Sequence, residues 1–214
     1  KNLVNNFSNK LFFGDDFSYT KNSKNFHYRD KYGKLKLPIP NILGEYQLEN
    51  ISTAVATLRT LDLGIKDDHI KNGIAKIKII ARLQEIKSGK LKRLAKNNKI
   101  LLDVSHNEDG ARVLNEYLET LNCKKHIIIG MMANKEHEKY IKYFKNISSL
   151  TTLDIPHQPN AISGKELREK FKYMPNTKYE TSIKKAVKSI DLGNGDLILI
   201  TGSLYLAGEV LKLN

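Results

Sequence analysis

The sequence contains a single cysteine, Cys123, among its 214 residues. One thiol forms no internal disulfide and lacks a second cysteine for a metal site, which is typical of a reducing compartment and of a buried or incidental side chain. Apolar runs are short, and none approaches the roughly 18 residues that a membrane-spanning helix needs. Residues 1–6 also lack the apolar segment of a signal peptide. We therefore expect a cytoplasmic protein with no membrane partner.

Several motifs with a known chemistry are absent from these residues. A phosphate-binding loop of the form Gly-x-x-x-x-Gly-Lys-Ser/Thr is missing, because the Gly-Lys pairs at 89–90 and 164–165 are followed by Leu91 and Glu166. There is no spaced Cys/His cluster for zinc and no Gly-x-Ser-x-Gly elbow of a hydrolase. We expect no metal site, and these residues alone lack the means to hold a nucleoside triphosphate.

Arginine is scarce for so basic a chain. The net charge is +13, but only 6 of the 36 basic residues are Arg, the residue preferred for bidentate contacts to phosphates and bases. The lysines are scattered, which indicates a compositional bias with Lys on solvated faces. We therefore expect no nucleic-acid partner, although a basic face is the usual footprint of one. The densest basic run, residues 87–93, is where such a surface would lie.

The second part of the chain alternates between two kinds of pattern. Short apolar runs predict strands at residues 100–104, 126–130, 150–155 and 197–201. Helical spacing predicts helices at residues 111–121, 140–147, 166–171, 183–190 and 204–213. Ser163 and Glu166 have the spacing of a capping box. This alternation predicts an α/β fold with a mostly parallel sheet and helices on both faces.

The first part of the chain has a different pattern. A short strand at residues 11–14, a polar turn region and alternating strands at 25–29 and 34–37 predict the edge of a β layer. An amphipathic pattern predicts a helix at 47–63, and a shorter predicted helix begins near Asp67. We place a domain boundary near residue 80.

The segment at residues 103–110 is the first candidate for function. The strand ends on Asp103, and His106 follows in a polar turn before the next helix. In open α/β sheets, ligands bind beyond the carboxyl ends of the strands. Asp103 could accept hydrogen bonds from a ribose, and His106 could contact a phosphate or carboxylate or transfer a proton. Alternatively, Asp103 and Asn107 only cap the helix.

Three further segments each allow two interpretations. Arg82 could clamp a nucleotide or form an interdomain salt bridge. Gln47 and Asn50, in the first turn of a helix, could read an adenine edge through their amides or cap that helix. The Thr-Gly-Ser turn at residues 201–203 could bind an anion at a helix N-terminus or be a tight turn that needs glycine.

These segments, in this order, resemble the C-terminal part of folylpolyglutamate synthase/dihydrofolate synthase, in the Mur ligase superfamily. The resemblance begins near Gly44 and is strongest at residues 81–84, 103–110 and 201–209, with a further similar segment at 130–136. It implies a Rossmann-like C-terminal Mur ligase domain at 79–214, preceded at 1–78 by the tail of a P-loop ATPase central domain. The chain would then be a fragment, inactive alone, without the family's upstream P-loop and magnesium ligands.

The resemblance also implies an activity. Enzymes of this family use ATP and Mg²⁺ to convert a folate carboxylate into an acyl phosphate, which the amino group of L-glutamate attacks. The substrates would be dihydropteroate, tetrahydrofolate or both, and we expect a monomer. The alternatives are another Mur-type amino-acid ligase, or a non-catalytic Rossmann-like binding module with a basic surface.

The resemblance assigns roles to individual residues. Gln47 and Asn50 would lie near adenine, Arg82 and Asp103 would hold the ribose and phosphate side of ATP, and His106 would position glutamate or the acyl phosphate. Lys135, as a catalytic residue, and Ser203, as a substrate-binding residue, are further carry-overs. The chain departs from the family pattern at four positions, which are Tyr46, Ala81, Ser105 and Glu108.

Overall fold

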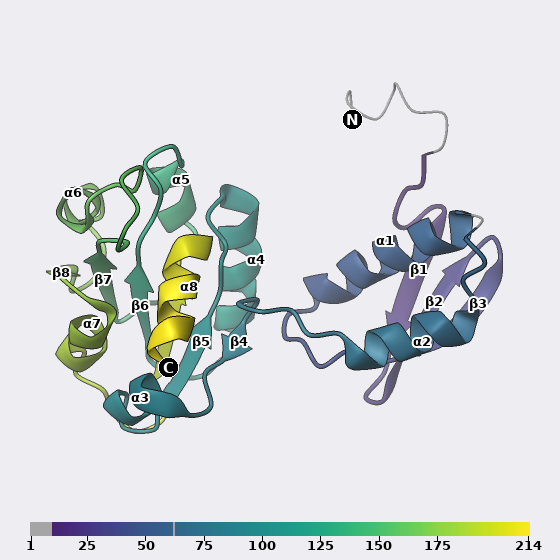
Figure 1. The fold of residues 1–214 in the computed structure, drawn as a ribbon, viewed down its shortest axis with the longest axis horizontal. Coiled ribbons are helices and arrows are strands. Elements are labelled where there is room, and N and C mark those ends of the chain that lie inside the picture. The colour runs from purple at the N-terminus through teal and green to yellow at the C-terminus, as the bar shows by residue number, and fades with distance from the viewer. Residues whose placement is uncertain (1–9, 62) are drawn as a thin grey trace. The chain divides into compact units, whose positions relative to one another are not determined.

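The computed structural model describes residues 10–61 and 63–214. The chain divides into two compact units, with the division between Lys78 and Ile79. Each unit has its own hydrophobic core, and Figure 1 labels the helices and strands of both units.

The first unit is an antiparallel sheet covered by two helices. Its strands, in the order β1-β2-β3, are β1 (Phe17–Lys21), β2 (Asn25–Asp30) and β3 (Gly33–Pro38). The helices are α1 (Tyr46–Thr60) and α2 (Asp67–Lys76). Alternate residues of β2 and β3 are buried against apolar positions of both helices, as period-2 and period-3.6 patterns require. The predicted strands at 25–29 and 34–37 and both helices are confirmed.

The predicted strand at residues 11–14 is wrong. This segment forms a turn in which the N–H of Gly14 donates to the carbonyl of Phe17 at 2.8 Å and that of Asp16 to Phe12 at 2.9 Å. Phe13 makes only an isolated bridge with Phe17. The strand β1 lies instead in the region expected to be a polar turn, because pairing with β2 outweighs its polar composition.

The second unit is a six-stranded, mostly parallel sheet in the order β4-β5-β9-β6-β7-β8. Only the short edge strand β4 (Gln84–Glu85) pairs antiparallel, with β5. The parallel strands are β5 (Lys99–Leu102), β6 (Lys125–Ile129), β7 (Ser149–Leu153), β8 (Lys178–Glu180) and β9 (Leu197–Thr201). The last strand in the sequence, β9, inserts between β5 and β6. The predicted α/β fold with a mostly parallel sheet is confirmed.

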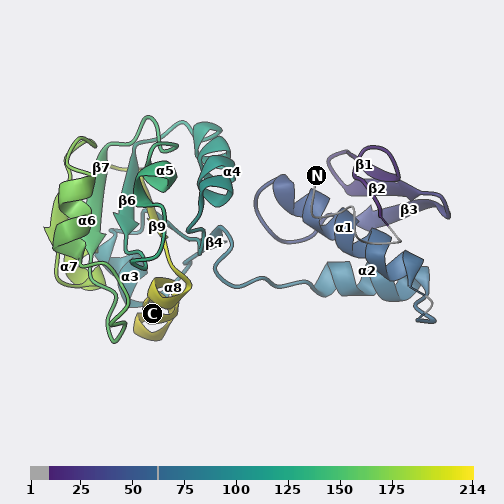
Figure 2. The ribbon, with the colours of Figure 1, turned by 90° about the horizontal axis from the view of Figure 1, so that it is seen from above.

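Helices cover both faces of this sheet. They are α3 (Gly89–Leu94), α4 (Glu108–Glu119), α5 (His137–Ile141), α6 (Gly164–Lys170), α7 (Ile183–Ser189) and α8 (Leu204–Leu213). Figures 1 and 2 show α8 and α4 on opposite sides of the strands. Residues of α3, α7 and α8 share one core with β5, β6 and β9.

The structure changes one predicted helix of this unit and contains one predicted helix cap. The helix expected at 140–147 begins at His137 and ends at Ile141. The chain continues as a turn and a loop, in which Phe144 is buried and Asn146 has φ +54°. At α6 the Ser163 half of the predicted capping box forms, since the Ser163 hydroxyl accepts the N–H of Glu166 at 3.2 Å.

Candidate functional site

The carboxyl ends of β5, β9 and β6 are held side by side. The N–H of Gly202 donates to the carbonyl of Ser105 at 3.1 Å, and that of Gly130 donates to Thr201 at 3.4 Å. Gly202 has φ +106°, and a Cβ there would lie 2.8 Å from the carbonyl oxygen of Gly130. This confirms the tight-turn interpretation, because both the backbone angle and the close approach require glycine. Segments distant in sequence therefore form one edge.

A buried hydroxyl cluster, formed by Ser105, Tyr140 and Thr201, joins this edge to α5. The Tyr140 hydroxyl lies 2.8 Å from Thr201 Oγ1 and 3.0 Å from Ser105 Oγ. Burial raises the pKa of Tyr140 above its ordinary value, so its phenol stays protonated and can donate. This cluster cannot be recognised in the sequence, because its members are 35 and 61 residues apart and no local pattern relates them.

Asp103 fixes the backbone on both sides of its strand end. Its Oδ2 accepts the N–H of Leu83 and its Oδ1 that of Ser105, both at 2.8 Å. The side chain is buried, with 1% of the residue exposed. Burial raises the pKa of Asp103, while its backbone hydrogen bonds and the nearby Arg82 act in the opposite direction. Asp103 does not cap α4, which is the role of Asn107, whose side chain accepts the N–H of Gly110 at 3.0 Å.

Arg82 projects from the loop that Asp103 holds. Its neighbours Ala81 and Leu83 have positive φ angles of 55° and 48°, and the Ala81 N–H donates to Gln84 Oε1 at 2.8 Å. The Ala81 carbonyl accepts the N–H of Val104 at 3.0 Å. Arg82 is exposed and, among the described residues of its own unit, has no ion-pair partner. A strained, well-anchored turn thus presents a free guanidinium.

His106 is half-buried and oriented by its own backbone. Its Nδ1 lies 3.0 Å from the carbonyl oxygen of Val104. A carbonyl only accepts, so we assign the ring hydrogen to Nδ1. In the neutral ring, Nε2 is then left as an acceptor for a ligand.

Glu108 contributes less negative charge to this edge than the sequence suggests. Its Oε1 pairs with Lys142 Nζ at 2.8 Å and accepts the Tyr143 hydroxyl at 2.7 Å. These two partners hold the pKa of Glu108 below its ordinary value. The carboxylate therefore stays ionised, and the Lys142 ammonium group at the C-terminal end of α5 balances its charge.

Ser203 and Lys135 follow β9 and β6. The Ser203 hydroxyl caps α8 by accepting the N–H of Tyr205 at 3.1 Å, and the residue is buried. Lys135 is half-buried in the turn before α5, where its N–H donates to the carbonyl of Met132 at 3.3 Å. Both belong to the same edge of the sheet as Asp103, because parallel strands end together.

Gln47 and Asn50 belong to the first unit and form a pair there. The Asn50 amide donates to Gln47 Oε1 at 3.3 Å. Gln47 is buried and Asn50 is exposed. The N-cap of α1 is Glu45, whose side chain makes no capping hydrogen bond. The two amides are thus fixed relative to each other at a helix start.

The described part of the chain contains neither a cluster of metal-binding side chains nor a helix that could cross a membrane. Within residues 10–61 and 63–214, no three or more His, Cys, Asp or Glu side chains are grouped so that they could hold a metal ion. In the same ranges, no helix has the length and apolarity to cross a membrane.

The fold and the candidate site of the second unit are typical of one class of ligand-binding domain. It is a Rossmann-like α/β domain with ligand-competent groups at the carboxyl ends of its central strands. The family model "Mur ligase, glutamate ligase domain" matches residues 67–204, and the chain belongs to this family.

The chain is similar to several proteins named dihydrofolate synthase/folylpolyglutamate synthase. The chain is 25% identical, over 218 residues, to dihydrofolate synthase/folylpolyglutamate synthase of Haemophilus influenzae, covering 91% of this chain and 48% of that protein. The fold is similar to that of E. coli FolC in complex with DHPP and ADP, with a TM-score of 0.77 and 23% identity over 94% of this chain and 46% of the other. It is also similar to the bifunctional folylpolyglutamate synthase/dihydrofolate synthase of Yersinia pestis complexed with AMPPNP and Mn ion, with a TM-score of 0.75 and 20% identity over 94% and 46%. The chain spans about half the length of the curated relatives it matches.

Proposed function

We propose that this chain supplies the C-terminal half of an ATP-dependent ligase that adds L-glutamate to dihydropteroate, tetrahydrofolate or both. The reaction would proceed through an acyl phosphate. Support comes from family membership and from the names of the relatives. The observation that carries the proposal is the convergence of Arg82, His106 and Ser203 at the carboxyl edge of β5 and β9.

The residues at this edge fit a phosphorylated nucleotide. Arg82 is exposed without an ion pair in its own unit, so its guanidinium is free to contact ribose or phosphate oxygens. Asp103 supports the same ligand by fixing the Arg82 loop through Leu83. ATP, when bound, supplies the phosphoryl group that activates the carboxylate. The divalent cation would be bound by residues of the proposed ligase that lie outside this chain.

The remaining residues would act on the acceptor. His106 presents Nε2 as a hydrogen-bond acceptor, suited to an amino or carboxyl group of glutamate. Lys135 would stabilise charge that builds on the phosphoryl and adduct oxygens. Ser203, which already caps α8, would contribute through its position at that helix start.

The first unit would be the tail of the ATPase domain, residues 1–78, with residues 79–214 as the C-terminal domain. Gln47 and Asn50 would contact adenine, because a paired amide offers one donor and one acceptor to a base edge.

The test is an assay of the whole reading frame that contains this chain. We expect glutamate-dependent ADP release with dihydropteroate or tetrahydrofolate, and none from the 214 residues alone. Arg82→Met and His106→Ala should each lower kcat/KM by about 100-fold, the usual cost of losing one charge-stabilising group. Arg112→Met is the matched control, since this exposed arginine pairs only with Glu116 on α4.

Other outcomes would replace the proposal. ADP release that needs a different amino acid or acceptor would indicate another Mur-type ligase. Failure of every acceptor, together with nucleic-acid affinity that falls steeply with salt, would indicate a basic binding module. Equal losses of kcat/KM in Arg82→Met and Arg112→Met would show that Arg82 has no specific role in the site.

A further inference from the structure

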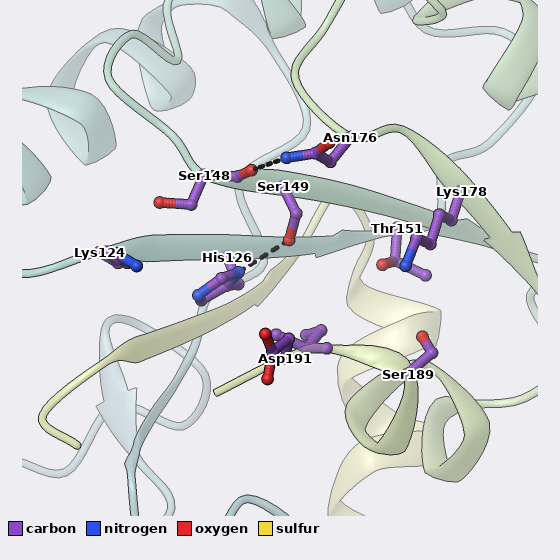
Figure 3. A pocket seen from close by; sticks show the side chains of 10 residues that line it. Lys124, His126, Ser148, Ser149, Thr151, Asn176, Lys178, Ser189 and Asp191 are labelled. Atoms are coloured by element: carbon purple, nitrogen blue, oxygen red, sulfur yellow. Dashed lines mark hydrogen bonds between the residues drawn. The ribbon is translucent and has the colours of Figure 1, made fainter. Parts of the chain in front are cut away.

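A hollow lies at the ends of the strands opposite to the candidate site. A cavity of about 360 Å³ opens at the amino-terminal ends of β6, β7 and β8, and the end of α7 forms another wall (Figure 3). Its size lies within the range of small-molecule sites, about 300–1,000 Å³. None of the residues discussed above lines it, so binding there does not depend on ligase activity.

The strand register brings four polar side chains to one face. His126 pairs with Ser149 on the neighbouring strand, and Thr151 pairs with Lys178. Ser149 and Thr151 are two residues apart on β7, so their side chains share a face of the sheet. This is the face that carries α7, whose end, at Ser189, also lines the cavity.

A buried relay fixes the chemistry of one cavity oxygen. His126 is 5% exposed, and its Nε2 lies 3.4 Å from Asp196 Oδ2 while its Nδ1 lies 2.8 Å from Ser149 Oγ. Asp196 Oδ2 also accepts the N–H of Gly193 at 2.7 Å. The carboxylate only accepts, so we assign a ring hydrogen to Nε2, and in that tautomer Nδ1 accepts the Ser149 hydroxyl. Ser149 Oγ then offers only lone pairs to a ligand.

The side chains that line the cavity include cations and hydrogen-bond acceptors. Of the ten described residues that line the cavity, only Ile190 is a large aliphatic residue. Figure 3 shows Thr151 and Lys178 at one end and Lys124 at the other. The two ammonium groups favour an anion, whereas Ser149 Oγ and the Asp191 carboxylate require donors such as ligand hydroxyls.

We propose that this cavity binds a phosphate monoester of a small polyol. The phosphate would lie against Lys178 and the Thr151 hydroxyl, and hydroxyls of the ligand would donate to Ser149 and Asp191. A ligand without polar groups would leave these side chains unpaired.

The test is isothermal titration of the 214-residue chain at low ionic strength with ribose 5-phosphate, ribose and inorganic phosphate. We expect saturable binding of ribose 5-phosphate with a Kd of about 0.1–1 mM, and at least about tenfold weaker binding of the two halves. Ser149→Ala and Lys178→Met should each weaken the phosphate ester by about tenfold. Lys172→Met, an exposed lysine that does not line the cavity, is the control.

Each of the following results would overturn the proposal. Lys178 also lines a neighbouring hollow with Arg168 and Tyr179, so loss in Lys178→Met with no change in Ser149→Ala would move binding there and overturn the proposal. Equal weakening by Lys172→Met would mean attraction to the net positive charge alone. No saturation up to about 10 mM, or equal affinity for inorganic phosphate, would also overturn it. Circular dichroism of each variant checks folding.

Discussion

Replacing Asp103 by Asn tests the claim that this carboxylate organises the candidate site. Its two oxygens accept separate backbone donors, Leu83 N–H and Ser105 N–H, both at 2.8 Å. An Asn side chain has the same shape but only one acceptor oxygen. Its NH₂ group must therefore face one of the two N–H donors.

The magnitude follows from what is lost. A hydrogen bond to a charged group contributes about 1.5–3 kcal/mol, and a buried unpaired donor costs about 1–3 kcal/mol. Relief from burying a charge offsets part of this, because burial raises the pKa of Asp103. We expect a net loss of about 2–4 kcal/mol in the free energy of unfolding.

Urea denaturation followed by circular dichroism measures the loss, and hydrogen exchange at the amides of Leu83 and Ser105 locates it. Asp109→Asn is the matched control, because Asp109 lies exposed in the first turn of α4 and contributes about 0.3–1 kcal/mol at most through the helix dipole. A loss in Asp103→Asn no larger than in this control would refute the reasoning.

Three other predictions concern the same unit. Gly202→Ala should lower the thermal unfolding midpoint, with a cost of about 1–3 kcal/mol from the positive φ and the close carbonyl, whereas Gly208→Ala, in open space on α8, should gain about 0.5–1 kcal/mol. Tyr140→Phe should cost about 1 kcal/mol in urea denaturation, because the other hydroxyls of the buried cluster lose a partner. Glu108→Gln should be less stable than the native chain at pH 7. That difference should vanish as pH falls, because a lowered pKa gives stability that is present above the ordinary value and lost when the carboxylate protonates. A difference that stays constant as pH falls from neutral into the acid range, while the chain remains folded, would contradict this.

Long periodic patterns predicted most of the second unit. The run at residues 197–201 became β9 with the same bounds, and the helix at 204–213 became α8. The short elements β4, β8 and α3 were not predicted, because two to six residues carry too little periodicity. In the first unit, β1 was missed because its residues are polar and only pairing with β2 makes them a strand.

The candidate site, too, was predicted from the sequence only in part. The segment at residues 103–110 stands out in the sequence, since a buried strand ends there on a carboxylate. Its partners do not stand out. The hydroxyl cluster and the relay from Asp196 through His126 to Ser149 join residues 23 to 96 positions apart.

The sequence by itself determined the α/β class, the buried strands and the polar segment that carries Asp103 and His106, because these depend on local periodicity and on residue type. Only the tertiary structure decided that β9 lies between β5 and β6. That strand order brings Thr201 to Ser105 at one end of the sheet and Asp196 to His126 at the other. Strand order is set by how whole strands and helices pack, and no single segment carries that information.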